Sequence, residues 1–199
     1  MEDKQAGSKP AKFRSRQVDA LFQQAGYSGN DIYYSSIKTW FIWAPLSLVF
    51  VSFFAIDFFP SASAFFDFAI SHWLFLLSYF VITYVFSAFV NNNFALTCRD
   101  LMIANPNFPF RRQMSIPYED IEAVKIDRLK APLILFFIIG SFGRNYIEIR
   151  TSAITRRFYC FNLPQYYDYG PDSGIKTIDE IAMALQHQGI AVTFNDNVD

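Results

Sequence analysis

The sequence predicts two kinds of structure in one chain: a helical hairpin in a membrane, followed by a mainly-β domain. Most of residues 40–90 form continuous apolar stretches rich in Phe, and after Val90 short apolar runs begin to alternate with polar residues. Continuous apolar stretches of about 20 residues are typical of membrane spans. Alternation with a period of two is typical of half-buried β-strands. The change of pattern therefore divides the chain.

Composition limits the classes of protein that the chain can belong to. A length of 199 residues suits one ordinary domain with a few additional elements. The net charge of -1 gives no basic field that would attract nucleic acid, so we expect no nucleic-acid partner. Cys98 and Cys160 are far apart and belong to no CxxC pattern or Cys/His cluster. Neither a metal site nor a disulfide framework is indicated.

Two spans are predicted, at residues 40–59 and 70–90. The first is interrupted only by two serines and Asp57, and the second contains no Asp, Glu, Lys or Arg. The connection between them has no Lys or Arg, whereas several basic residues precede the first span. By the positive-inside rule, both termini are expected in the cytoplasm. A cleaved signal peptide is a poorer interpretation, because the apolar stretch is too long.

The arm before the spans, residues 1–38, contains a short amphipathic pattern. Val18, Leu21 and Phe22 recur at helical spacing, and Gly26 is placed to end the helix. Basic residues precede this pattern, so the helix either lies on anionic lipid or packs on the following domain. Both alternatives stay open at this point.

The segment after the spans, residues 91–199, is predicted to be a domain of short strands closed by one helix. A capping-box pattern at Thr177–Glu180 is followed by an apolar stripe, with Gly189 as a stop. We expect two antiparallel sheets or an open barrel, capped by this C-terminal helix. Residues 190–194 are expected to add an edge strand. The predicted strands are FALT, LMIAN, RQMSI, IEAVKID, NYIEIRT and RRFYCFN.

Taken together, these segments resemble the bacterial membrane-anchored proteins with a pleckstrin-homology-like domain. The resemblance rests on the hairpin, on Phe94–Thr97 with Leu101–Ile103, on Ile116–Ile121 and on the terminal helix at 178–188. It implies a PH-like fold, no catalytic activity and an integral place in the bacterial inner membrane. The first turn of the domain, Cys98-Arg99-Asp100, has one basic and one acidic residue. It therefore departs from the basic loop with which eukaryotic PH domains bind phosphoinositides.

No motif for catalysis or for a cofactor appears in the sequence. It has no P-loop, GxGxxG, GxSxG or HExxH pattern and no spacing of metal ligands. The acidic pair Glu119-Asp120 lies in a predicted turn before a strand. We therefore expect a protein that is not an enzyme and has no cofactor or bound metal.

Two features are candidate interaction sites. The basic pairs Arg111-Arg112 and Arg156-Arg157 suit lipid phosphates or an acidic partner, although solvated strand ends would have the same composition. The second feature is a run of large apolar residues with two apolar faces, which lipid, a neighbouring subunit or the core of the domain would cover. This run consists of Leu133, Ile134, Leu135, Phe136, Phe137, Ile138 and Ile139.

The sequence thus favours a non-catalytic, membrane-anchored binding or scaffolding protein, as an accessory subunit of a larger membrane assembly. Its expected partners are membrane lipids and another protein. Recognition of anionic lipid through the basic pairs is the alternative. A small transporter or membrane enzyme is less favoured, because Asp57 and His72 are the only candidates for polar chemistry in the predicted spans.

Overall fold

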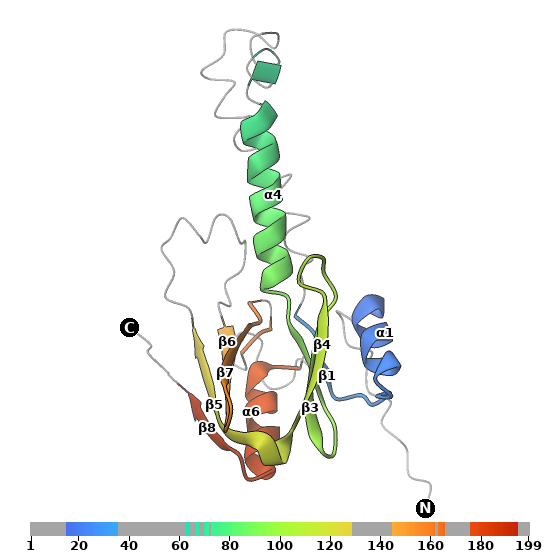
Figure 1. Cartoon of the computed structure of the whole chain (residues 1–199), viewed down its shortest axis with the longest axis vertical. Coiled ribbons are helices and arrows are strands. Elements are labelled where there is room, and N and C mark those ends of the chain that lie inside the picture. The colour runs from blue at the N-terminus through green and yellow to red at the C-terminus, as the bar shows by residue number, and fades with distance from the viewer. Residues whose placement is uncertain are drawn as a thin grey trace, which may run out of the picture.

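The computed structural model describes residues 15–35, 63, 67, 70, 71, 73–128, 145–161, 163–165 and 176–194. In this part of the chain, two four-stranded sheets form the body of the molecule, and helix α6 (Ile178–His187) lies between their ends (Figure 1). The long helix α4 (Trp73–Phe89) projects from this body. The mainly-β domain with a C-terminal helix that the sequence predicts is confirmed.

The first sheet has the strand order β1-β2-β3-β4 and is antiparallel throughout. A short 3-10 helix, η1 (Tyr118–Asp120), leads from it to the second sheet. The register places Phe94 opposite Ile103 and Leu101 opposite Ile116, so that large apolar side chains share one face. The strands are β1 (Ile32–Tyr33), β2 (Asn93–Leu96), β3 (Asp100–Asn105) and β4 (Arg112–Pro117).

The second sheet has the order β7-β6-β5-β8. Its strands are β5 (Ile121–Arg128), β6 (Asn145–Thr151), β7 (Thr155–Tyr159) and β8 (Ala191–Phe194). The first three strands are antiparallel, but β8 pairs with β5 in parallel. The expected edge strand at 190–194 therefore exists, although it does not extend the antiparallel pattern. Strand β1, which has only two residues, has no counterpart among the predicted strands.

Helix α6 (Ile178–His187) closes the core between the two sheets. Its apolar stripe is fully buried and contacts residues of both sheets, including Phe94, Ile147 and Phe158. Gly189 ends the helix with a φ of 81°, a conformation that glycine adopts without a steric penalty. Thr177 is the N-cap residue, as the predicted capping box requires, but its side chain makes no capping hydrogen bond.

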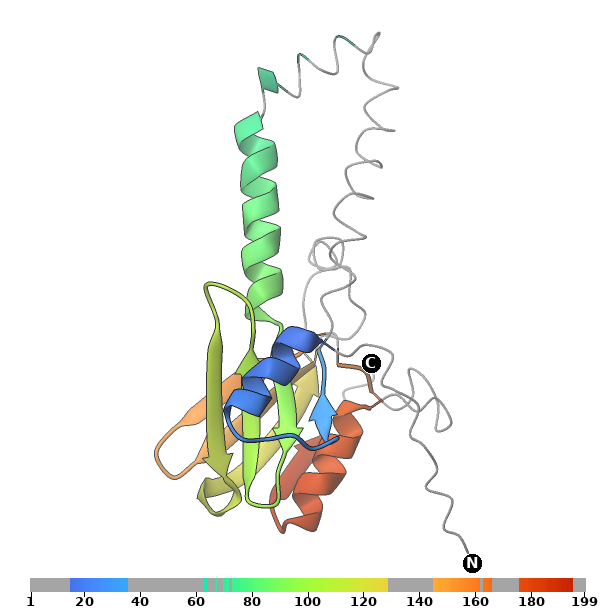
Figure 2. The same ribbon diagram turned by 90° about the vertical axis from the view of Figure 1, so that its right-hand side faces the viewer.

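Helix α1 (Arg16–Gln24) covers the opposite face of the first sheet (Figure 2). Val18, Leu21 and Phe22 are buried against a cluster that includes Ala95 and Met102. The apolar stripe of the N-terminal arm therefore packs on the domain, which is one of the two alternatives that the sequence left open. With α1 on one face and the core on the other, strands β2 and β3 are buried on both faces.

The predicted transmembrane hairpin is wrong. Among the residues that the structure describes, no helix is both long enough and apolar enough to cross a bilayer. The second predicted span corresponds to α4 (Trp73–Phe89). The first predicted span, 40–59, lies outside the described residues. The integral inner-membrane localisation with cytoplasmic termini, which rested on the hairpin, is corrected with it.

Candidate functional site

Helix α4 is the most conspicuous surface feature of the described chain. It rises from the first sheet and stands clear of both sheets over most of its length (Figures 1 and 2). Its sequence, WLFLLSYFVITYVFSAF, contains no charged residue. Large apolar side chains are nevertheless exposed along it, among them Leu74 at 61% and Ile82 at 62%. A monomeric protein rarely exposes such a continuous apolar surface without a partner for it.

Four of the exposed side chains on α4 repeat at the spacing of a helix-pairing seam. Leu74, Leu77, Val81 and Tyr84 follow one another at intervals of three, four and three residues. This is the a/d spacing with which two helices pack side by side. We call these four residues the α4 seam. Tyr84 also donates a hydrogen bond from its hydroxyl to the Phe108 carbonyl at 3.0 Å, so one end of the seam is tied to the loop between β3 and β4.

Buried asparagines fix the C-terminal end of α4 to the sheets. Asn105, at the end of β3, donates to the Ala88 carbonyl at 2.8 Å. Asn92 donates to the Phe89 carbonyl at 3.3 Å and to the Tyr159 carbonyl at 2.6 Å. The last carbonyls of a helix lack partners within the helix, so these amides satisfy groups that would otherwise be buried without a hydrogen bond.

A third asparagine extends this network to β3 and to Ser35, two residues after β1. The Asn93 side-chain oxygen accepts from the Ser35 N–H at 2.8 Å, and its amide donates to the Ala104 carbonyl at 3.3 Å. Asn92, Asn93 and Asn105 are all fully buried, and together we call them the asparagine anchor. Because fully paired buried polar networks specify one arrangement, the anchor fixes the direction in which α4 projects.

The four arginines of the predicted basic pairs differ in their contacts. Arg112 donates to the Asn92 side-chain oxygen at 2.8 Å, and its guanidinium lies 5.0 Å from the centre of the Phe158 ring. Partial burial, and then the nearby Arg156, lower the pKa of Arg112. Arg157 forms an ion pair with Glu148 and lies 5.4 Å from the Tyr146 ring centre. Arg111 is an exposed neighbour at the start of β4.

These contacts give Arg112 and Arg157 partners within the chain. Arg112 supports the asparagine anchor, and Arg157 joins β7 to β6 in register opposite Glu148. Recognition of lipid phosphates by the basic pairs stays a prediction. The apolar run Leu133 to Ile139, the other predicted interaction surface, lies outside the described residues and also stays a prediction.

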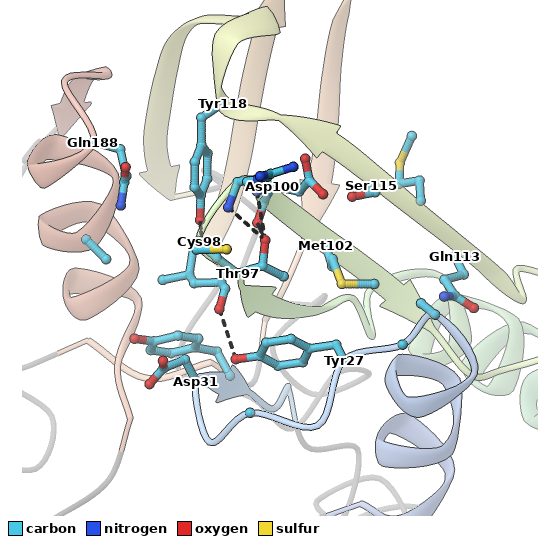
Figure 3. A pocket seen from close by; sticks show the side chains of 18 residues that line it. Tyr27, Asp31, Thr97, Cys98, Asp100, Met102, Gln113, Ser115, Tyr118 and Gln188 are labelled. Atoms are coloured by element: carbon cyan, nitrogen blue, oxygen red, sulfur yellow. Dashed lines mark hydrogen bonds between the residues drawn. The ribbon is translucent and has the colours of Figure 1, made fainter.

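A second candidate site is a cleft of about 1180 Å³ beside the β2–β3 hairpin. This hairpin lies at the end of the first sheet away from α4 (Figure 2). It is bordered by the connection from α1 to β1, by the β2–β3 hairpin, by β4 and η1, and by the end of α6. Tyr27, Tyr33 and Tyr118 line it together with Asp31 and Asp100, and we call it the tyrosine cleft. Figure 3 shows Tyr27 and Tyr118 directed from opposite sides toward the hairpin.

Burial and nearby carboxylates keep the cleft tyrosines protonated. Burial is the main cause that raises the pKa of Tyr118 to about 12, and Asp100 adds to it. Burial, followed by Asp31, raises the pKa of Tyr27 as well. The pKa of Tyr33 is raised by burial and then by Glu180. The phenols are thus neutral hydrogen-bonding groups in an acidic surrounding, not bases or nucleophiles at neutral pH.

Sequence reasoning identified neither the asparagine anchor nor the tyrosine cleft. For the anchor a signal was present, because three consecutive asparagines, two of them in the anchor, begin two residues after the end of α4. For the cleft there was none, since its residues come from segments scattered between Ala25 and Gln188. Within the described residues no group of three His, Cys, Asp or Glu side chains is placed to bind a metal ion.

The fold and these sites together define a small mainly-β protein with a rigidly anchored, projecting apolar helix. Neither the models of known protein families nor the curated proteins compared with this sequence give a match. The predicted membership in the family of membrane-anchored proteins with a PH-like domain is therefore corrected. The resemblance rested on short segments and their order, and the predicted hairpin was one of its parts.

Proposed function

We propose that the chain is a non-catalytic scaffolding protein that assembles by packing its α4 seam against the same helix of a second copy. The observation that supports this proposal is a seam of four exposed residues at a/d spacing, on a helix whose base is held by buried hydrogen bonds. A rigid helix loses little conformational freedom when it binds, so its apolar area contributes efficiently to association.

The composition of α4 favours a second copy as the partner. A helix without Asp, Glu, Lys or Arg meets no like-charge repulsion when it packs against itself. Leu74, Leu77 and Val81 are each more than half exposed, at 61%, 51% and 51%, and full burial of such a side chain contributes about 1.5 to 3 kcal/mol. Two helices in this register would lie 8–10 Å apart and cross at roughly 20°.

Two neighbouring residues of α4 provide a matched test. Val81 belongs to the seam, whereas Ile82, which is similarly exposed, lies about a third of a turn around the helix. Val81→Ser should weaken dimerisation about thirtyfold, because each dimer loses roughly 1 kcal/mol at each of two copies. Ile82→Ser should leave dimerisation nearly unchanged.

The mass of the full chain should be measured by sedimentation equilibrium over a range of concentrations. Far-UV circular dichroism would show that both variants keep their fold. A monomeric wild-type chain at all concentrations would refute assembly with a second copy, and so would an equal loss of association in the two variants.

A further inference from the structure

Two of the cleft tyrosines use their hydroxyl protons within the wall of the cleft. The Tyr27 hydroxyl donates to the Leu96 carbonyl at 2.9 Å, and the Tyr118 hydroxyl donates to the Thr97 carbonyl at 2.9 Å (Figure 3). The single proton of each phenol is therefore used inside the wall of the cleft, and each phenolic oxygen keeps lone pairs for a ligand. The Thr97 hydroxyl likewise donates to the Asp100 carbonyl at 3.0 Å.

The carboxylates of the cleft, like the phenolic oxygens, can accept hydrogen bonds from a donor group of a ligand. Asp31 and Asp100 both line it, and both add to the electrostatic rise in the pKa of Tyr118. Asp31 is paired with Lys176 at 3.3 Å, whereas no ion pair of Asp100 is found among the described residues. Arg99, at the tip of the hairpin, also lines the cleft and offsets part of this negative charge.

Two residues that line the cleft, Tyr33 and Asp31, already contact an ammonium group of the chain itself. The Lys176 ammonium lies 5.0 Å from the centre of the Tyr33 ring, is paired with Asp31, and donates to the Asn30 carbonyl. A carboxylate, a carbonyl and an aromatic face are the groups that proteins use to bind organic cations. Tyr33 and Asp31 thus already bind an alkylammonium group, although Lys176 itself does not line the cleft.

We infer that the tyrosine cleft binds an alkylammonium group, with Asp100 as its ion-pair partner and Tyr27 and Tyr118 as acceptors. The two rings also offer faces and edges to the carbon chain of such a ligand. A free amine and the side chain of a lysine in a partner protein share this chemistry. This site is independent of the α4 seam, from which the first sheet separates it.

Calorimetric titration of the full chain should test three probes: butylammonium, the Nα-acetyl methylamide of lysine, and inorganic phosphate. Both amines should bind and phosphate should not. Asp100→Asn should weaken amine binding about tenfold, which corresponds to the loss of one charge-assisted contact. Asp120→Asn is the matched control, because Asp120 is an exposed carboxylate of η1 that does not line the cleft.

A change at Lys176 gives a result of the opposite sign and does not depend on the fold of the Asp100 variant. Lys176→Met releases Asp31, which lines the cleft, and removes a positive charge beside it, so amines should bind several-fold more tightly. Tighter binding of the lysine derivative than of butylammonium assigns the site to a protein partner, and equal binding assigns it to free amines. Phosphate binding in place of amines, no amine binding at about 10 mM, or equal affinities in all variants would overturn the inference.

Discussion

The asparagine anchor predicts a large destabilisation for a change at Asn105. Asn105→Ala removes the donor to the Ala88 carbonyl at 2.8 Å and the acceptor of the Asn107 N–H at 3.0 Å. Ala88 is 1% exposed, so its carbonyl would be left without a partner, at a cost of about 1 to 3 kcal/mol. Asn107 is half-buried, and water replaces much of its lost bond. We expect a total loss of about 2 to 4 kcal/mol.

A second change at the same position tests the direction of the hydrogen bond. Asn105→Asp has nearly the same shape, but it replaces the donating amide with an acceptor, so that two oxygens face each other at the Ala88 carbonyl. It also buries a charge, because Asn105 is fully buried. Asp should therefore destabilise the protein more than Ala does.

Urea unfolding of the full chain, followed by circular dichroism, would measure both changes from the midpoint at unchanged slope. Asn107→Ala is the control, because it keeps the backbone N–H and removes only the side-chain hydrogen bond of 3.4 Å to Asn105, which should cost less than about 1 kcal/mol. A loss below about 0.5 kcal/mol for Asn105→Ala, or an Asp variant that is more stable than the Ala variant, would refute the proposed role of the anchor.

Two further predictions concern groups that burial perturbs. Burial raises the pKa of Tyr118 from 10.0 to about 12, so the folded state holds this proton more tightly than the unfolded state does. The contribution of Tyr118 to the free energy of unfolding should change between about pH 10 and pH 12: the native state loses stability as the pH rises through this range. Tyr118→Phe should make this loss smaller when unfolding is measured as a function of pH. Cys160 is buried, and burial raises the pKa of its thiol, whereas Cys98 is exposed. A water-soluble thiol reagent should therefore modify one cysteine per native chain and both in denaturant; modification of both in the native chain would contradict the buried position.

The strands were predictable because their sequence pattern is local. In β6, Ile147 and Ile149 alternate with Glu148 and Arg150, and the structure buries the two isoleucines in the core. The parallel pairing of β8 with β5 was not predictable, because the position and direction of β8 depend on how α6 packs between the sheets. Strand β1 was missed because two residues are too few to show an alternation.

The error at α4 has a different physical cause. A helix without charges has the same composition whether lipid or another protein covers it, so composition alone did not decide between the two. Within the described residues no helix is long and apolar enough to span a bilayer, and the exposed residues of α4 have a/d spacing. The tyrosine cleft could not be predicted, since Tyr27 and Tyr118 meet only after the β2–β3 hairpin has formed between them.

Strand β2 connects the two candidate sites, and its position makes them one rigid unit. It begins with Asn93 of the asparagine anchor and ends with Leu96, whose carbonyl accepts the Tyr27 hydrogen bond in the tyrosine cleft. All four residues of β2 are buried, and the strand is paired with β1 on one side and β3 on the other. A shift of β2 would break both ladders and expose its apolar side chains, so α4 and the cleft keep a fixed relative position. Because the hairpin lies at the end of the sheet away from α4 (Figure 2), pairing of the α4 seams would leave the cleft of each copy open to its ligand.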